Sequence, residues 1–229
     1  MKLVIFDCDG TLVDSQHMIV AAMNSAYAAH DLPAPPRERL LSIVGLSLPQ
    51  AFAALGEGMP DFPVDSFVQA YKDAFFALRQ SDRYLEPLFP GALDALAALA
   101  ARNDVLLGVA TGKSRRGVDA VLGRHGLLGH FITIKTADDA PSKPDPGMVE
   151  QAMREAGVGP ERTLMVGDTV YDIAMAQAAG TAAVGVSWGY HPVEALHGAG
   201  AAAVVDAFPE LIPALDRLWS DVEPATSNA

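Results

Sequence analysis

The chain opens with an apolar run that ends in two aspartates. Residues 3–6 are all apolar, and Asp7, Cys8, Asp9 and Gly10 follow directly. A continuous apolar run of this kind is typical of a strand buried on both faces, and therefore of a parallel sheet covered by helices. On such a strand the spacing would place the Asp7 and Asp9 side chains on one face, at the carboxyl edge where open α/β sheets bind ligands. Two carboxylates held there repel each other unless a cation or a shared proton lies between them.

The same residues have a plainer interpretation. Asp9 and Gly10 form a common turn dipeptide, so the segment could simply be a strand that ends in a polar turn. Glycine at position 10 lets the chain turn away without a β-carbon in its path. Thr11 is predicted to close this turn rather than to touch a substrate.

Three later segments favour a site over a turn. They are Thr111-Gly112 after the apolar run 104–110, Lys143 between the turn formers of 142–146, and Asp168, followed four residues later by Asp172, after the apolar run 163–167. Each has its own structural explanation, since Thr111 or Asp168 can cap a helix and Lys143 can be a solvated lysine. All four segments in this order are hard to explain as coincidence.

Apolar strands and helical patterns alternate along most of the chain, which predicts an α/β fold with a parallel sheet and helices on both faces. The expected strands are 2–6, 104–110, 131–135, 163–167 and 182–186. The long gap between the first two strands contains helical patterns instead, at 15–30, 36–43, 49–55 and 64–80. We therefore predict a core domain formed by residues 1–14 and 84–229, and a helical cap domain formed by residues 15–83. Hinges are expected near 13–16 and 81–88.

Composition excludes several classes of partner. The 229 residues are 50% hydrophobic and carry a net charge of −12, which argues against binding to nucleic acid or to an anionic membrane surface. An anionic substrate would have to be attracted locally, by a metal and by Lys143. Cys8 is the only cysteine, and no targeting signal is visible, so the expected location is the cytoplasm.

The order Asp-x-Asp-Gly-Thr, strand-end Thr, Lys-Pro and Gly-Asp-x-x-x-Asp resembles the haloacid dehalogenase superfamily of aspartate-nucleophile phosphohydrolases. The resemblance extends from Phe6 to about Trp188. It is closest to the phosphoglycolate phosphatase type, because Leu-Val-Asp-Ser at 12–15 and a helical insert follow the first motif. The resemblance implies a Rossmann-like sheet of order 5-4-1-2-3 with an inserted α-helical cap. Gly112 departs from the pattern, since many relatives carry Asn there.

Carried over residue by residue, the resemblance implies a Mg²⁺-dependent phosphatase. Asp7 would be the nucleophile that forms an aspartyl-phosphate, and Asp9 the general acid and then the general base. Thr111, the amide of Gly112 and Lys143 would hold the phosphate. The side chains of Asp7 and Asp168 and the backbone carbonyl of Asp9 would bind the metal, and Asp172 would support it through a water.

The predicted substrate is a small phosphorylated metabolite, with phosphoglycolate first, and the chain would act as a monomer or homodimer. A phosphosugar mutase or a pyrophosphatase of the same superfamily remains an alternative. A haloalkanoate dehalogenase is disfavoured, because an acid such as Asp9 has no role in the displacement of a halide. The non-enzyme alternative is a receiver-like phospho-signalling module, which would carry its aspartate on the third strand. Five cap cations could read a second anionic group on the substrate: Arg37, Arg39, Lys72, Arg79 and Arg83. Segment 188–191 follows the fifth expected strand and could border the site, although a packed loop is the favoured prediction.

Overall fold

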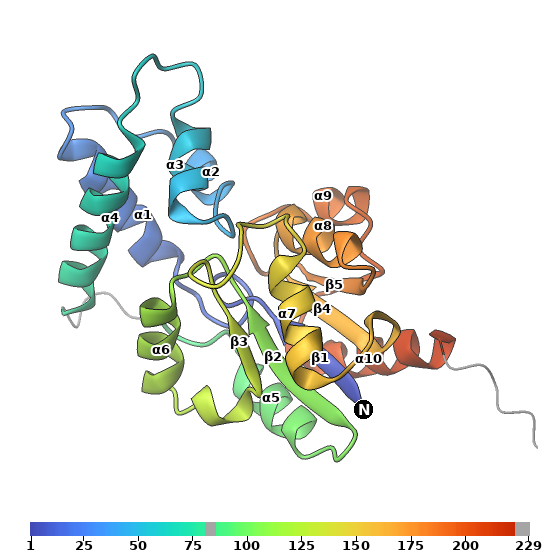
Figure 1. Cartoon of the computed structure of the whole chain (residues 1–229). Coiled ribbons are helices and arrows are strands. Elements are labelled where there is room, and N and C mark those ends of the chain that lie inside the picture. Colours follow the sequence, from blue (N-terminus) through green and yellow to red (C-terminus); the bar gives the residue numbers. More distant parts are fainter. Residues whose placement is uncertain (81–85, 223–229) are drawn as a thin grey trace, which may run out of the picture.

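The computed structural model describes residues 1–80 and 86–222, and in it a six-stranded parallel sheet forms the centre of the molecule (Figure 1). The strand order is β3-β2-β1-β4-β5-β6. The strands are β1 Lys2–Phe6, β2 Val105–Ala110, β3 Thr133–Lys135, β4 Thr163–Gly167, β5 Ala182–Val186 and β6 Ala203–Val205. The predicted α/β class and the order 5-4-1-2-3 are confirmed, and β6 adds a sixth strand beside β5.

Strand β6 was missed because it is short and lies in an alanine- and glycine-rich stretch. Its three residues follow the sequence Gly-Ala-Gly-Ala-Ala at 198–202. Three residues are too few to display a strand period, and the surrounding small residues match a helix equally well. The pairing of Val184 with Ala203 makes the segment a strand, so tertiary contact rather than local pattern determines it.

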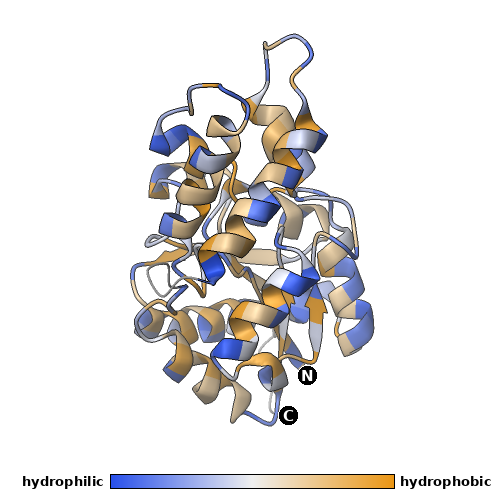
Figure 2. Ribbon diagram, turned by 90° about the vertical axis from the view of Figure 1, so that its left-hand side faces the viewer, coloured by the Kyte–Doolittle hydropathy of each residue, from blue (hydrophilic) through white to orange (hydrophobic). Residues whose placement is uncertain are grey.

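Helices cover both faces of the sheet. They are α5 Ala92–Ala100, α6 Arg115–Arg124, α7 Gly147–Ala156, α8 Val170–Ala178, α9 Val193–Gly198 and α10 Phe208–Val222. Strand β1 supplies both faces, because Val4 and Phe6 belong to one apolar cluster and Leu3 and Ile5 to the other. In Figure 2 the helices alternate between hydrophobic and hydrophilic segments along their length, as expected for helices with one buried face.

The insert between β1 and α5 is helical, as the sequence predicts. Its helices are α1 Gln16–Ala28, α2 Arg37–Leu41, α3 Leu48–Leu55 and α4 Val64–Arg79. They gather to one side of the sheet (Figure 1) and pack around an apolar cluster of their own that includes Phe52, Phe67 and Tyr71. We refer to these four helices and their loops as the cap. Most of the second predicted hinge, together with Arg83 and the C-terminal tail, lies outside the described residues.

No helix in residues 1–80 and 86–222 is both long enough and apolar enough to cross a membrane.

Candidate active site

The sheet brings the predicted residues to one edge. Strand β1 pairs with β2 on one side and with β4 on the other, so the strand order reverses there. Asp7 follows β1, Thr111 follows β2 and Asp168 follows β4, and the Asp7 N–H donates to the carbonyl of Val166 at 2.9 Å. Open α/β sheets bind ligands in the crevice at this kind of switch point.

Asp7 is almost fully buried, at 1% exposure, and neither of its carboxylate oxygens is satisfied by a well-aligned hydrogen bond. Lys143 Nζ lies 3.0 Å from Asp7 Oδ1, close enough for an ion pair. Even so, neither carboxylate oxygen accepts a well-aligned hydrogen bond from the described residues. Burial raises the pKa of Asp7 to about 6, the charge of Lys143 opposes this rise, and the charge of Asp172 adds to it. A carboxylate in this setting has lone pairs to offer to another group.

Asp168 is buried but well supported. Thr11 Oγ1 donates to its Oδ1 at 2.8 Å, and the Tyr190 N–H donates to its Oδ2 at 2.9 Å. Burial raises its pKa well above the ordinary range, and the charges of Asp172 and Asp7 raise it further. Gly10 has a φ of +88°, and a β-carbon there would lie 2.7 Å from Asp168 Cγ. Glycine at position 10 therefore permits both the turn and the close approach of Asp168.

Asp172 has both of its oxygens engaged. Lys143 Nζ donates to Oδ1 at 2.5 Å, while the N–H and hydroxyl of Thr169 donate to Oδ2 at 3.1 and 2.7 Å. Thr169 and Asp172 thereby form a capping box at the start of α8. Burial alone would lower the pKa of Lys143, but the charges of Asp172 and Asp7 outweigh it and raise that pKa. Lys143 is therefore a buried cation between two carboxylates.

These acids fit a hard divalent cation. Asp7, Asp168 and Asp172 each present a carboxylate oxygen within 4.8 Å of the others, and one ammonium, that of Lys143, lies among the three. The donor set consists of oxygens only, which suits Mg²⁺, and Lys143 is paired with Oδ1 of Asp7 while neither Asp7 oxygen accepts a well-aligned hydrogen bond from the described residues. The site therefore retains negative charge and free lone pairs for a cation.

Asp9 faces a different environment from Asp7. Ser15 Oγ donates to Asp9 Oδ1 at 2.6 Å, and Lys113 Nζ donates to the two carboxylate oxygens at 2.9 and 3.0 Å. Ser15 Oγ also lies 3.2 Å from the Tyr190 hydroxyl. Sequence reasoning did not assign Lys113, although its position two residues after Thr111 at a strand end was a usable signal.

The loop after β5 borders the site, which is the less favoured of the two predictions for segment 188–191. The Tyr190 N–H holds Asp168, and the Trp188 indole N–H donates to the carbonyl of Thr11 at 3.1 Å. Thr11 itself, expected only to close a turn, donates its hydroxyl to Asp168. The two contacts of Thr11 join residues more than 150 positions apart, and the contact of Tyr190 with Asp168 spans 22 positions, so no local pattern could reveal them.

Thr111 and Gly112 lie where a cap loop meets the core. Thr111 is buried at the end of β2, and its N–H donates to the carbonyl of Lys135 at 3.0 Å. A β-carbon on Gly112 would collide with the carbonyl of Gly45 and lie 2.7 Å from that of Leu46. The absence of an Asn side chain at position 112 thus has a steric reason, because the cap backbone occupies that space.

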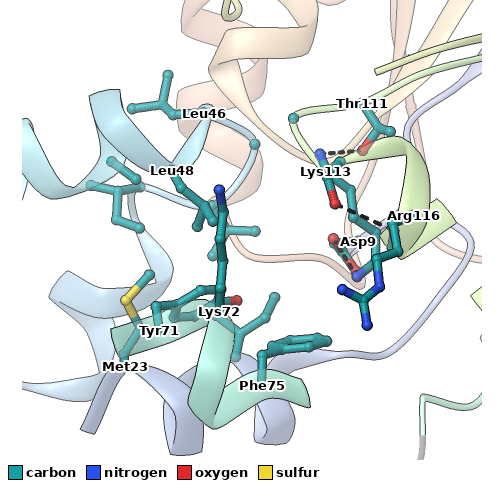
Figure 3. Close-up of a pocket in the computed structure, with 18 of the residues that line it drawn as sticks. Asp9, Met23, Leu46, Leu48, Tyr71, Lys72, Phe75, Thr111, Lys113 and Arg116 are labelled. Atoms are coloured by element: carbon teal, nitrogen blue, oxygen red, sulfur yellow. Dashed lines mark hydrogen bonds and ion pairs between the residues drawn. The ribbon is translucent and has the colours of Figure 1, made fainter. Parts of the chain in front are cut away.

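A cavity of about 390 Å³ lies between the cap and the core, and both Asp7 and Asp9 line it. Figure 3 shows Asp9, Thr111 and Lys113 on one side and Met23, Leu46, Leu48, Tyr71, Lys72 and Phe75 of the cap on the other. Most of the cap wall is apolar. A group held at Asp7 would therefore extend from a charged core floor towards an apolar cap.

The cap cations have different surroundings. Arg37 donates to Gln16 Oε1 at 2.5 Å, Arg39 donates to the carbonyl of Ala54 at 2.7 Å, and Arg79 is paired with Glu86. Lys72 and Arg79 line the cavity, whereas Arg37 and Arg39 do not. Of the four cap cations that the structure describes, two therefore line the cavity, and one of these, Arg79, is paired with Glu86.

The fold and the site define an α/β enzyme whose reaction centre lies at the switch point of a parallel sheet. Comparison with known proteins gives the family: residues 4–186 match the description "Haloacid dehalogenase-like hydrolase". The chain belongs to this family of hydrolases, which confirms the resemblance and the prediction of an enzyme.

Relatives agree over almost the full length. The chain is 37% identical over 220 residues to "Probable phosphatase IndB" of Dickeya dadantii, covering 94% of each protein. It is 38% identical over 218 residues to a phosphoglycolate phosphatase of Rhodospirillum rubrum, covering 92% of this chain and 89% of that one. Among solved structures, a hydrolase from Pseudomonas syringae superimposes with a TM-score of 0.82 at 26% identity, covering 95% of this chain and 99% of the other.

Proposed function

We propose that the protein is a Mg²⁺-dependent phosphomonoesterase that hydrolyses a small phosphorylated metabolite through an aspartyl-phosphate. The observation that carries the proposal is Asp7, a buried carboxylate with no aligned hydrogen-bond donor, facing a cavity beside Lys143 and two further acids. A carboxylate held in this way is available both as a metal ligand and as a nucleophile. The names of the relatives support a phosphatase.

In the first step an oxygen of Asp7 forms a bond to phosphorus and the bond from phosphorus to the ester oxygen breaks. The ester oxygen takes the electron pair and a proton from Asp9, which also lines the cavity. Lys143 neutralises charge on Asp7, while the Thr111 hydroxyl and the Gly112 amide take phosphoryl oxygens. Mg²⁺ held by Asp7, Asp168 and the carbonyl of Asp9, with Asp172 in support, would reduce the repulsion between the carboxylate and the phosphate.

In the second step Asp9, now a carboxylate, accepts a proton from water as the water oxygen bonds to phosphorus. The bond between phosphorus and Asp7 breaks, which releases inorganic phosphate and restores both acids. The same residue thus serves as acid and then as base. Its place beside Asp7 at the end of β1 suits both roles.

We propose two domains: a core formed by residues 1–14 and 84–229, and a cap formed by residues 15–83. The core would bind the phosphoryl group and the cap would contact the leaving group. Support comes from the separate apolar cluster of the cap helices and from the cavity between cap and core. Phosphoglycolate is the first candidate substrate, because one of the relatives described above is named a phosphoglycolate phosphatase. A single buried cysteine, Cys8, suits an enzyme of the cytoplasm.

Phosphate release from a panel of esters tests the proposal. The panel comprises phosphoglycolate, pyrophosphate, sugar phosphates, nucleotides and p-nitrophenyl phosphate, each with Mg²⁺. Asp7→Asn should lower turnover more than about a thousandfold, because an amide is a poor nucleophile. Asp119→Asn, at an exposed position on α6, is the matched control and should leave turnover unchanged.

Two results would contradict the proposal. If Asp7→Asn keeps wild-type turnover, Asp7 is not the nucleophile. If a sugar phosphate is isomerised without release of phosphate, the chain is the mutase left open by the sequence.

A further inference from the structure

Four alternating charges run from the active site into the cap. Lys113 Nζ lies 2.9 Å from Asp9 Oδ1 and 3.2 Å from Glu86 Oε1. The other oxygen of that glutamate, Oε2, accepts from Arg79 Nε at 3.0 Å and from Arg79 Nη2 at 2.8 Å. The order is therefore Asp9, Lys113, Glu86, Arg79, with each charge next to its opposite.

The network is buried and balanced. The side chain of Glu86 is 1% exposed, that of Lys113 8% and that of Arg79 16%. With Asp9 in its carboxylate form, two acids and two cations leave no net charge, and removing one partner would leave another buried charge uncompensated. Glu86 also offsets the charge of Lys113, so Asp9 is oriented without facing an uncompensated cation. Such a set of groups holds its members in one geometry.

The four residues come from four separate segments. Asp9 follows β1, Lys113 follows β2, and Arg79 is the last residue of cap helix α4. Glu86 lies where the chain returns from the cap to the core, and its carbonyl lies 2.8 Å from Nε2 of His125. The ring of Phe75 on α4 packs 5.1 Å from Lys113 Nζ and 5.0 Å from the guanidinium carbon of Arg79. The geometry therefore links the end of α4 to the carboxylate of Asp9.

We propose that Lys113 is a positioning residue that orients Asp9 for proton transfer, and that Glu86 and Arg79 make this orientation depend on the placement of cap helix α4. The inference rests on the proposed function, since it assumes that Asp9 is the acid that protonates the leaving oxygen. Lys113 contacts both oxygens of Asp9 at nearly equal distances, which fixes the plane of the carboxylate as well as its place.

Gly117 provides a way to move Lys113 without removing a charge. A β-carbon at position 117 would lie 2.9 Å from Lys113 Cγ and 3.3 Å from its Cδ. The aliphatic part of the Lys113 side chain therefore packs against Gly117 on α6, where there is no side chain, and its ammonium reaches Asp9. Alanine is a better helix former than glycine, so Gly117→Ala should displace Lys113 while supporting the helix itself.

The test compares two leaving groups. Protonation by Asp9 matters for an alkyl ester such as phosphoglycolate, or the best alkyl ester of the panel, and matters little for p-nitrophenyl phosphate, whose leaving group needs no acid. Lys113→Met should lower kcat/KM for the alkyl ester at least about tenfold more than for p-nitrophenyl phosphate. Gly117→Ala and Glu86→Gln should also lower kcat/KM more for the alkyl ester than for p-nitrophenyl phosphate. Arg115→Met, at the exposed start of the same helix, is the matched control.

Thermal melting shows which variants are folded. If Lys113→Met does not fold, the comparison of the two esters in Gly117→Ala tests whether the position of Lys113 affects Asp9. A folded variant that loses activity on both esters by the same factor overturns the inference and leaves the proposed function intact. A wild-type protein that hydrolyses neither ester overturns the proposed function itself. An unchanged ratio in Gly117→Ala, with normal melting, shows that the position of Lys113 does not matter to Asp9.

Discussion

Asp7 and Asp9 lie two residues apart, yet the structure gives their carboxylates opposite environments. Asp7 has no aligned donor within the described residues, while Asp9 accepts from Ser15 and Lys113. A carboxylate with no aligned hydrogen bond has lone pairs available for a metal or phosphorus, and one held by several donors is oriented. The different roles proposed for these two identical side chains rest on these different partners.

Asp9→Asn tests this division. The amide should still allow an activated ester to phosphorylate Asp7, whereas hydrolysis of the adduct should stall for lack of a base. Rapid mixing with p-nitrophenyl phosphate should therefore give a burst of nitrophenol followed by a slow steady state. Equal loss of the burst and the steady state would show that Asp9 acts in the first step with this ester as well.

Gly112→Ala tests the steric reason for glycine at the end of β2. The added β-carbon must displace the cap loop at Leu46, which lies 2.7 Å away, and small displacements in an active site cost roughly tenfold to a hundredfold in rate. We expect kcat/KM to fall by that factor with little change in melting temperature. Gly129→Ala, where an added β-carbon has open space, is the control. Unchanged kinetics in Gly112→Ala would mean that cap docking there is not needed.

At the scale of elements, helix α8 and the loop after β5 both contact the cap. The hydroxyl of Tyr171 donates to the carbonyl of Ser42 at 3.1 Å, and His191 Nε2 lies 3.1 Å from the same oxygen. His191 Nδ1 accepts from the Val170 N–H at 3.2 Å, so the proton of the neutral ring belongs on Nε2 and is donated to Ser42. The carbonyl of Ser42 in the cap thus contacts side chains from two core elements, α8 and the loop after β5.

This contact should depend on pH. Burial lowers the pKa of His191 from its ordinary 6.5, against the smaller opposing effects of the bond to Ser42 and the charge of Asp172. Since the folded state binds this proton less readily than the unfolded state, the contribution of His191 is complete above pH 6.5. It is lost as the pH falls from there towards the folded pKa.

Urea unfolding of wild type and His191→Gln at pH 7.5 and 5.5 measures this contribution. Wild type should lose more unfolding free energy on acidification than the variant, by at most about 1.4 kcal/mol for each pH unit. Equal losses in the two proteins would mean that His191 does not titrate differently on folding.

At the scale of the whole molecule, a chain of net charge −12 concentrates three buried acids around one buried lysine. The raised pKa values of Asp7 and Asp168 mean that their charged forms are costly in the metal-free protein. A divalent cation would relieve that cost. Metal binding should therefore change the stability of the entire fold.

Thermal melting with and without Mg²⁺ measures this effect. At a metal concentration about 100-fold above Kd, binding adds about 2.7 kcal/mol, or roughly 5–10 °C for a chain of this size. EDTA should abolish both the shift and the phosphatase activity, and Asp168→Asn should lose most of the shift. Calcium should also bind but inhibit, because it prefers more ligands at longer distances. An equal shift in Asp168→Asn would place the metal elsewhere.

Much of this molecule could be predicted from its sequence. Continuous apolar runs identify buried strands such as β1 and β4 without any knowledge of their neighbours, because burial on both faces demands apolar residues throughout. Asp7 and Asp168 follow those runs directly, so the sheet alone brings them together. Helical patterns between β1 and β2 likewise predicted the cap.

The tertiary structure alone decided the rest, because the deciding contacts join distant residues. Lys113 meets Asp9 across 104 positions and Glu86 across 27, and neither pairing leaves a local pattern. Strand β6 exists through its pairing with β5, and Gly112 is explained by the backbone of a cap loop more than 60 residues away. Local sequence determines which segments are buried and which acids directly follow the ends of buried strands. Packing of the sheet and its loops determines which cation Asp7, Asp9 and Asp172 meet, and packing of the cap determines the pair of Arg79 with Glu86.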